Sequence, residues 1–144
     1  RRQRQMCIRD SLEAKNHFAP GANLVVKEYI DNMPDLMAAA DLVISRSGAL
    51  TLAELEAVGR ASVLIPSPNV AENHQYYNAL ELQKAGAAVV IEEKNLTGEG
   101  LVKTVEELLN TPGKLVEMGA NAKTLGNPHS LDLITEKLME LMKN

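Results

Sequence analysis

Short apolar runs alternate with amphipathic segments along most of the chain. The apolar runs predict strands at residues 24–27, 42–45, 62–65 and 88–91. The amphipathic segments predict helices at residues 34–40, 51–58, 74–85, 100–109, 112–123 and 128–142. The strand runs are apolar throughout rather than alternating, which is typical of strands covered on both faces. Strands and helices that alternate with short links predict an α/β fold, with a doubly wound parallel sheet.

Two segments can be interpreted beyond this pattern. The last helix carries one apolar stripe, which we expect to pack against the core; it consists of Leu131, Ile134, Leu138 and Leu141. The first eleven residues are basic and have no apolar period, as in extensions left by cloning or sequence assembly. We therefore expect residues 1–11 to be a non-native or disordered extension, and residues 12–144 to form one domain, a usual domain length.

Composition excludes several classes of protein. The formal net charge of -4 argues against general nucleic-acid binding, which needs clustered Lys and Arg. The single cysteine, Cys7, cannot form an internal disulfide, which fits a reducing cytoplasm. The three histidines lack metal-ligand spacing, so we expect no metal and no cofactor. The apolar runs are much shorter than the ~20 residues of a membrane helix, although association with a membrane surface stays open.

The segment from Leu42 to Glu54 leads from a predicted strand through small residues into a helix. Gly48 lets the backbone approach a ligand closely, and the amides of residues 48–50 are expected at a helix N-terminus. That end of a helix attracts anions. Arg46 can add a full positive charge, so we consider Arg46 and Ser47 candidate phosphate contacts.

Thr51 and Glu54 have two interpretations. Their spacing matches a capping box, in which Thr51 caps the helix and Glu54 reaches back to the cap. A carboxylate in the first helical turn also faces the ligand side of such a sheet, where it can accept both hydroxyls of a ribose. The spacing favours the cap, and the two roles can coexist.

The segment from Pro66 to Asn78 leaves the third strand through two prolines. Gln75 and Asn78 are three residues apart, so they share one face of the next helix. Their amides can donate and accept, which suits sugar hydroxyls, although a solvated first turn explains them equally simply. The adjacent His74 is more typical of a surface or capping residue than of a catalytic base.

At these residues the chain resembles the MurG family of bacterial cell-wall N-acetylglucosaminyltransferases. The similar strings are residues 29–33 (YIDNM), 46–51 (RSGALT), 66–78 (PSPNVAENHQYYN) and 83–88 (QKAGAA). The resemblance extends from about residue 12 to the C-terminus. It implies a GT-B glycosyltransferase of two Rossmann-like domains, with this chain as the C-terminal domain that holds the donor, UDP-N-acetylglucosamine.

The resemblance also assigns roles to individual residues. Ile30 meets the uracil through its backbone, and Glu54 holds the ribose diol. Gly48, Ala49, Leu50 and Thr51 line the diphosphate and the sugar. Gln75 and Asn78 bind the hydroxyls of N-acetylglucosamine. The implied reaction inverts the anomeric carbon and adds the sugar to lipid I, forming lipid II for peptidoglycan, on the inner face of the cytoplasmic membrane and without a metal.

Two features of the family are missing from the sequence. These are the glycine-rich turn that opens its C-terminal domain and the whole N-terminal domain, which supplies the acceptor site and the base. We therefore assign no catalytic residue in this chain and expect it to be inactive alone. The alternatives are a donor-binding subunit that pairs with a separate acceptor-binding chain, and a non-catalytic flavodoxin-like module.

Overall fold

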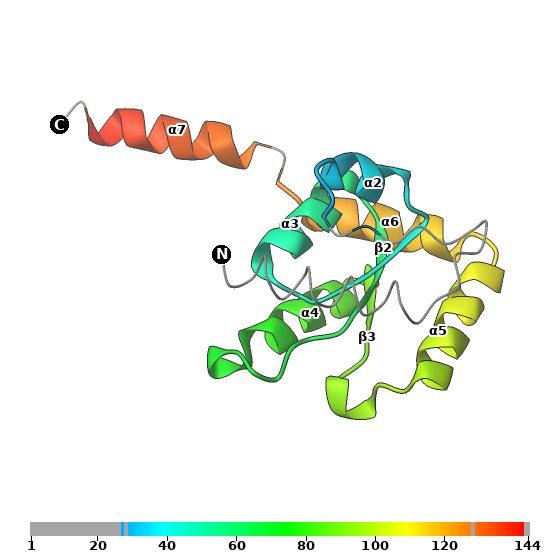
Figure 1. The fold of residues 1–144 in the computed structure, drawn as a ribbon. Coiled ribbons are helices and arrows are strands. Elements are labelled where there is room, and N and C mark those ends of the chain that lie inside the picture. The colour runs from blue at the N-terminus through cyan, green and yellow to red at the C-terminus, as the bar shows by residue number, and fades with distance from the viewer. Residues whose placement is uncertain (1–26, 28, 128, 143–144) are drawn as a thin grey trace. The chain divides into compact units, whose positions relative to one another are not determined.

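The computed structural model describes residues 27, 29–127 and 129–142 (Figure 1). The chain divides into two units, residues 1–33 and 34–144. The predicted strand at 24–27 and the predicted extension at 1–11 lie almost entirely outside the described residues. The second unit contains a three-stranded sheet and most of the described helices, and it carries most of the candidate site residues.

The described helices and strands follow the order predicted from the sequence. In chain order, they are α2 (Met33–Ala39), β1 (Leu42–Ser45), α3 (Ala49–Val58), β2 (Ala61–Leu64), the 3-10 turn η1 (Ala71–Asn73), α4 (His74–Lys84), β3 (Ala88–Val90), the 3-10 turn η2 (Glu93–Asn95), α5 (Gly98–Asn110), α6 (Lys114–Leu125) and α7 (Ser130–Leu141).

The three strands form a parallel sheet in the order β1-β2-β3. In the register, Ser45 pairs with Leu64, which in turn pairs with Val90. The carboxyl ends of all three strands therefore meet at one edge of the sheet. The segments that follow them, residues 46–48, 65–73 and 91–95, share that edge, which is where parallel α/β sheets bind ligands.

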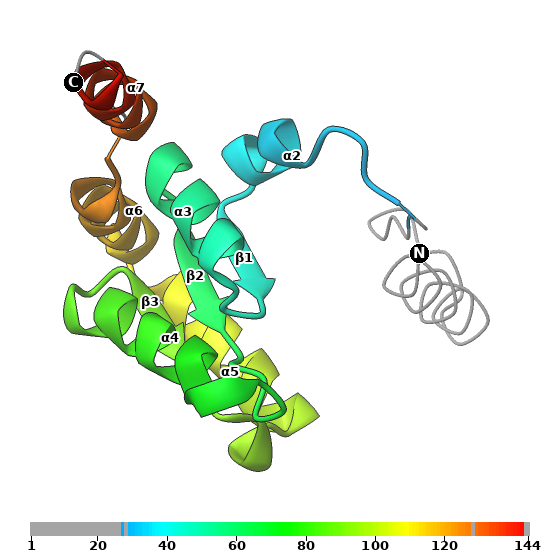
Figure 2. The same cartoon turned by 90° about the vertical axis from the view of Figure 1, so that its left-hand side faces the viewer.

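Both faces of the sheet are covered, which confirms the doubly wound prediction. Strand β2 is buried along its whole length, with side chains alternating between two clusters. Leu64 packs with residues of α3 and α4, including Leu55 and Leu82. Val63 packs with Leu108 of α5 and with α6. Figures 1 and 2 show α4 and α5 on opposite sides of the strands.

Gly86 ends α4 as its place in the sequence predicts. It adopts the left-handed conformation at φ 71°, which glycine reaches without steric cost. Its amide donates to the Gln83 carbonyl at 2.9 Å, and the Ala87 amide donates to the Leu82 carbonyl at 2.8 Å. These bonds satisfy carbonyls that the helix end would leave unpaired, and the chain then turns directly into β3.

The prediction that the last helix packs against the core is wrong for the described residues. The four stripe residues of α7 are between 56% and 73% exposed. The apolar period gives the helix one hydrophobic face, but no described element covers that face. Among the described residues, the structure contains no helix that is both long and apolar enough to span a membrane.

Candidate functional site

The edge of the sheet brings together candidate residues from two loops. Arg46, Ser47 and Gly48 follow β1, while Gln75 lies in the first turn of α4, after the loop that follows β2. Ser47 donates a hydrogen bond to Gln75, so the two segments are in direct contact. Ile30 belongs to the first unit, where it is half-buried.

The N-terminus of α3 is open and faces this edge. The helix begins at Ala49, preceded by Gly48 in an extended conformation (φ -67°, ψ 144°), and no side chain caps it. The first helical hydrogen bond runs from the Leu52 amide to the Gly48 carbonyl at 3.0 Å. The amides of residues 49–51 therefore have no partner within the helix, and this geometry suits an anion.

No steric contact with the described residues requires a glycine at position 48. A Cβ atom added there would meet nothing within 4 Å, and its φ is accessible to any residue. The space beside Gly48 is therefore open. Close approach of a ligand to the backbone at this position stays a prediction.

The capping-box interpretation of Thr51 and Glu54 is wrong. Helix α3 begins two residues earlier than predicted, so Thr51 is its third residue and Glu54 lies in the second turn. The small residues 47–49 allow the backbone to enter the helix early, and the cap position falls on Gly48, which has no side chain. Glu54 is half-buried, and its predicted contact with a ribose remains a prediction.

Arg46 is held by acceptors at the ends of the other two strands. Its Nη1 donates to the carbonyls of Ile65 at 3.2 Å and Pro66 at 3.4 Å, just after β2. The same nitrogen forms an ion pair with Glu93, just after β3. Because its charge is matched by Glu93, Arg46 in this arrangement joins three strand ends.

Ser47 and Gln75 form a short network with the loop after β2. Ser47 is fully buried, and its hydroxyl donates to the Gln75 carbonyl at 2.8 Å. The side-chain oxygen of Gln75 accepts from the Ser67 amide at 3.0 Å. Asn78 lies one turn further along α4 and is half-buried. Sequence spacing identified Gln75 and Asn78, but this network could not be read from it.

The loop before α4 has an unusual backbone. Glu72 and Asn73 are consecutive non-glycine residues with positive φ, 53° and 52°. Such conformations cost free energy and are often found at functional sites. The His74 side chain is exposed, as its interpretation as a surface residue predicts, and its ring hydrogen bonds to the Ala71 carbonyl at 2.9 Å. The positive φ of Asn73 could have been anticipated, because asparagine tolerates this conformation. Nothing in the sequence indicates the positive φ of Glu72.

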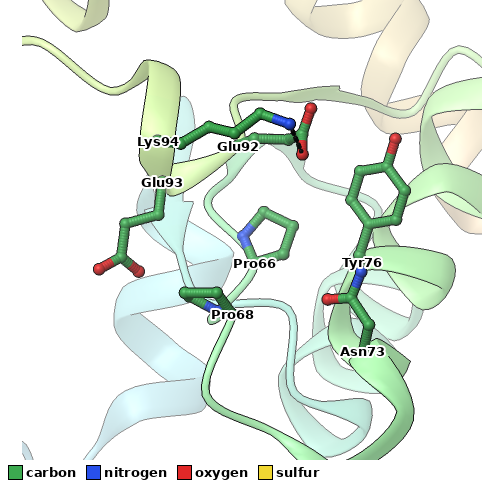
Figure 3. Close-up of a pocket in the computed structure, with 7 residues that line it drawn as sticks. All are labelled: Pro66, Pro68, Asn73, Tyr76, Glu92, Glu93 and Lys94. Carbon is green, nitrogen blue, oxygen red and sulfur yellow. Dashed lines mark ion pairs between the residues drawn. The ribbon is translucent and has the colours of Figure 1, made fainter.

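A cavity of about 330 Å³ lies beside this loop (Figure 3). It is lined by Pro66, Pro68, Asn73, Tyr76, Glu92, Glu93 and Lys94. Lys94 pairs with Glu92 at 2.9 Å, and this hydrogen bond raises the pKa of Lys94. None of the candidate residues predicted from sequence lines the cavity. It adjoins the site through Pro66 and Glu93, the partners of Arg46.

Comparison with known proteins gives a consistent result. Residues 4–134 match the Glycosyltransferase family 28 C-terminal domain. A UDP-N-acetylglucosamine--N-acetylmuramyl-(pentapeptide) pyrophosphoryl-undecaprenol N-acetylglucosamine transferase of Desulforudis audaxviator is 49% identical over 85% of this chain and 33% of its own length. The transferase of the same name from Acetivibrio thermocellus is 46% identical over 94% of this chain and 37% of its own length.

A solved structure agrees with the sequence relatives. The crystal structure of Acinetobacter baumannii MurG superposes with a TM-score of 0.77 and 31% sequence identity, covering 91% of this chain and 38% of that protein. The chain therefore has the Rossmann-like α/β fold found in MurG. It spans about one third of the length of the curated relatives that it matches.

Proposed function

This chain belongs to glycosyltransferase family 28 as a C-terminal domain, and from that membership we propose that it binds the donor of an N-acetylglucosamine transferase. The donor is UDP-N-acetylglucosamine, the sugar nucleotide in the names of its relatives. The observation that carries the proposal is the open N-terminus of α3 at the carboxyl edge of the sheet. A helix end with free amides is suited to a diphosphate.

The other candidate residues support the same ligand. Arg46 and Ser47 precede the helix and hold the turn that leads into it, beside the proposed position of the phosphates. Glu54, half-buried in α3, provides acceptors for a ribose diol, and Ile30 provides backbone groups for the uracil. Gln75 and Asn78 supply amides for the sugar hydroxyls. The members of this set that follow β1 and β2 come from the edge at which parallel α/β sheets bind ligands.

The acceptor in the proposed reaction is the lipid-linked muramyl pentapeptide, lipid I, and the product is lipid II for peptidoglycan. The acceptor hydroxyl attacks the anomeric carbon of the sugar, the bond to UDP breaks, and the configuration inverts. Charge on the departing UDP is stabilised by the amides of α3 rather than by a metal. Because lipid I resides in a membrane, we place the enzyme on the cytoplasmic surface of the cell membrane.

The donor site can be tested by nuclear magnetic resonance on this chain. We expect UDP-N-acetylglucosamine to shift the amide signals of residues 48–51 and of Gln75 in a saturable way. GDP-mannose at the same concentration serves as the control for unspecific anion binding. Equal shifts with both nucleotides, or saturable shifts confined to residues far from the edge, would contradict the proposal.

The transfer reaction needs a larger protein, because the chain covers only about a third of its relatives. A chimera can carry the preceding residues of the Acetivibrio thermocellus relative followed by this chain. We expect it to convert a soluble lipid I analogue and UDP-N-acetylglucosamine into the disaccharide product. A chimera that folds and binds UDP but uses another sugar nucleotide in preference would overturn the proposed donor.

A further inference from the structure

Two consecutive residues after β1 hold both ends of the loop that joins β2 to α4. Arg46 binds the carbonyls of Ile65 and Pro66, where the loop begins. Ser47 binds the carbonyl of Gln75, where the loop joins the helix. The side chains of neighbouring residues thus fix a segment of about ten residues at both of its ends.

The contact made by Ser47 is well shielded from water. Ser47 has no exposed surface, and its hydroxyl lies 2.8 Å from the Gln75 oxygen. A buried hydroxyl is costly unless it finds a partner, so this hydrogen bond favours one position of the first turn of α4. The backbone of Gln75 is therefore held by Ser47, which follows β1.

The side chain of Gln75 is held from the loop side. The Ser67 backbone N–H can only donate, so the Gln75 atom 3.0 Å from it must be the amide oxygen. The contact therefore identifies which end of the terminal amide is the oxygen and which is the nitrogen. The amide nitrogen, with two N–H donors, is the end left for a ligand.

From these contacts we infer that Ser47 and Arg46 are positioning residues, which hold the β2–α4 loop so that Gln75 offers hydrogen-bond donors to the ligand. The part of this inference that concerns the ligand rests on the proposed function. It restricts the sugars that can bind, because the sugar must present a hydrogen-bond acceptor to the amide nitrogen of Gln75. A hydroxyl or an acetamido carbonyl oxygen qualifies, whereas a group that can only donate does not.

The positioning can be measured without any ligand, through hydrogen exchange of the Ser67 amide. We expect Ser47→Ala to raise the exchange rate of this amide by about tenfold, the effect of weakening one hydrogen bond. Gln75→Ala, which removes the acceptor itself, should raise the rate at least as much. It also covers the case in which Ser47→Ala fails to fold.

Ser62→Ala is the matched control. Ser62 is also a fully buried serine, but its hydroxyl has no hydrogen-bond partner among the described residues. We expect this variant to leave the exchange of the Ser67 amide unchanged. If Gln75→Ala or a folded Ser47→Ala variant leaves that exchange rate unchanged as well, the positioning inference is overturned.

The polarity of Gln75 is tested with UDP-N-acetylglucosamine and UDP by calorimetric titration. Gln75→Glu keeps an acceptor for the Ser67 amide but removes both donors. We expect it to weaken UDP-N-acetylglucosamine binding by about tenfold while leaving UDP binding nearly unchanged. If Gln75→Glu binds UDP-N-acetylglucosamine more tightly than UDP by the same factor as the parent chain does, the donor role of Gln75 is refuted. Binding of neither compound to the parent chain would count against the proposed function, and hydrogen exchange would still decide the positioning role.

Discussion

Gly119 lies so close to Gly59 that a Cβ atom added to Gly119 would stand 2.5 Å from the Gly59 carbonyl oxygen. Helix α6 crosses the turn between α3 and β2 at this point. Gly59 has a φ of 66° and ends α3, so its carbonyl belongs to a backbone that has little freedom to move. The close approach explains a glycine inside a helix, where alanine would otherwise be favoured by about 1 kcal/mol.

We therefore predict that Gly119→Ala destabilises the fold. Overpacking a tight contact costs about 1–3 kcal/mol, which outweighs the gain in helix propensity. Urea unfolding followed by circular dichroism measures the difference. Gly98→Ala is the control, because a Cβ atom there meets nothing within 4 Å. It should be neutral or stabilising by up to about 1 kcal/mol. A Gly119→Ala variant as stable as the control would contradict the prediction.

The sequence predicted most of the fold because each described element has its own local signal. The apolar runs gave the three described strands within one residue, and Gly86 marked the end of α4. Local signals failed where the result depends on a neighbour. The start of α3 was placed two residues late, because a glycine cap leaves no side-chain signature. The stripe on α7 indicates a hydrophobic face, but a pattern cannot say what covers it.

The candidate site was predictable in its parts but not in its connections. Gly48 and Gln75 stand out through residue type and spacing. The hydrogen bond from Ser47 to Gln75 spans 28 positions, and the ion pair from Arg46 to Glu93 spans 47. Both depend on the order of strands in the sheet, which no short segment encodes. The sequence therefore indicated Arg46 only as a candidate phosphate contact, whereas in the structure its guanidinium is paired with Glu93.

Glu54→Ala should separate ligand binding from stability. No side chain caps α3, so removing Glu54 should change the free energy of unfolding by no more than about 0.5 kcal/mol, as for neutral surface changes. If Glu54 holds the ribose, UDP affinity should fall at least about tenfold, because hydrogen bonds to a charged group contribute about 1.5–3 kcal/mol. Titration calorimetry and thermal melts measure the two effects.

The control for this prediction is Glu56→Ala, which removes a carboxylate from the same helix. It should leave UDP affinity unchanged. Equal losses of affinity in both variants would indicate an effect of net charge rather than a contact with the ribose. A lower melting temperature for Glu54→Ala with unchanged affinity would instead leave Glu54 with only a structural role.

Glu56 also predicts a pH dependence. Partial burial disfavours its charged form and raises the pKa of this carboxyl above the ordinary value of 4.5. The folded state then holds the proton more tightly than the unfolded state. The stability contributed by Glu56 is complete below pH 4.5 and is lost as the pH rises through the folded pKa.

Glu56→Gln cannot ionise, so the variant should not lose this stability as the pH rises. We expect the variant to melt at a slightly higher temperature than the parent at pH 7, and the gain should be small because burial is partial. The difference should shrink to nothing, or reverse, below about pH 4, where the parent carboxyl is protonated as well. A gain that stays constant from pH 4 to pH 8 would mean that packing, and not ionisation, is responsible.

The exposed stripe of α7 should contribute little to the stability of this chain. We predict that the triple variant Leu131→Gln, Ile134→Gln and Leu138→Gln changes the free energy of unfolding by no more than about 0.5 kcal/mol per site, because all three side chains are more than half exposed. It should also bind less of an apolar fluorescent dye. Met118→Ala, at a position 1% exposed, is the contrast and should cost about 2–5 kcal/mol. A large loss in the triple variant would show that the stripe is covered in solution.

The contacts of Arg46 predict how its contribution to stability divides between its partners. The side chains of Arg46 and Glu93 are 52% and 39% exposed, so their ion pair is screened by water and should couple by no more than about 1 kcal/mol. The carbonyls of Ile65 and Pro66 directly follow β2 in part-buried surroundings, and leaving them without a donor costs up to about 1–3 kcal/mol. In a double-mutant cycle with Arg46→Ala and Glu93→Ala, most of the cost of losing Arg46 should therefore persist when Glu93 is already absent.

Urea unfolding at low and high salt measures both parts, since only the coupling with Glu93 should weaken as salt is added. If the coupling accounted for the whole cost of Arg46→Ala, the guanidinium would act through its charge alone, and Arg46→Lys would then preserve stability.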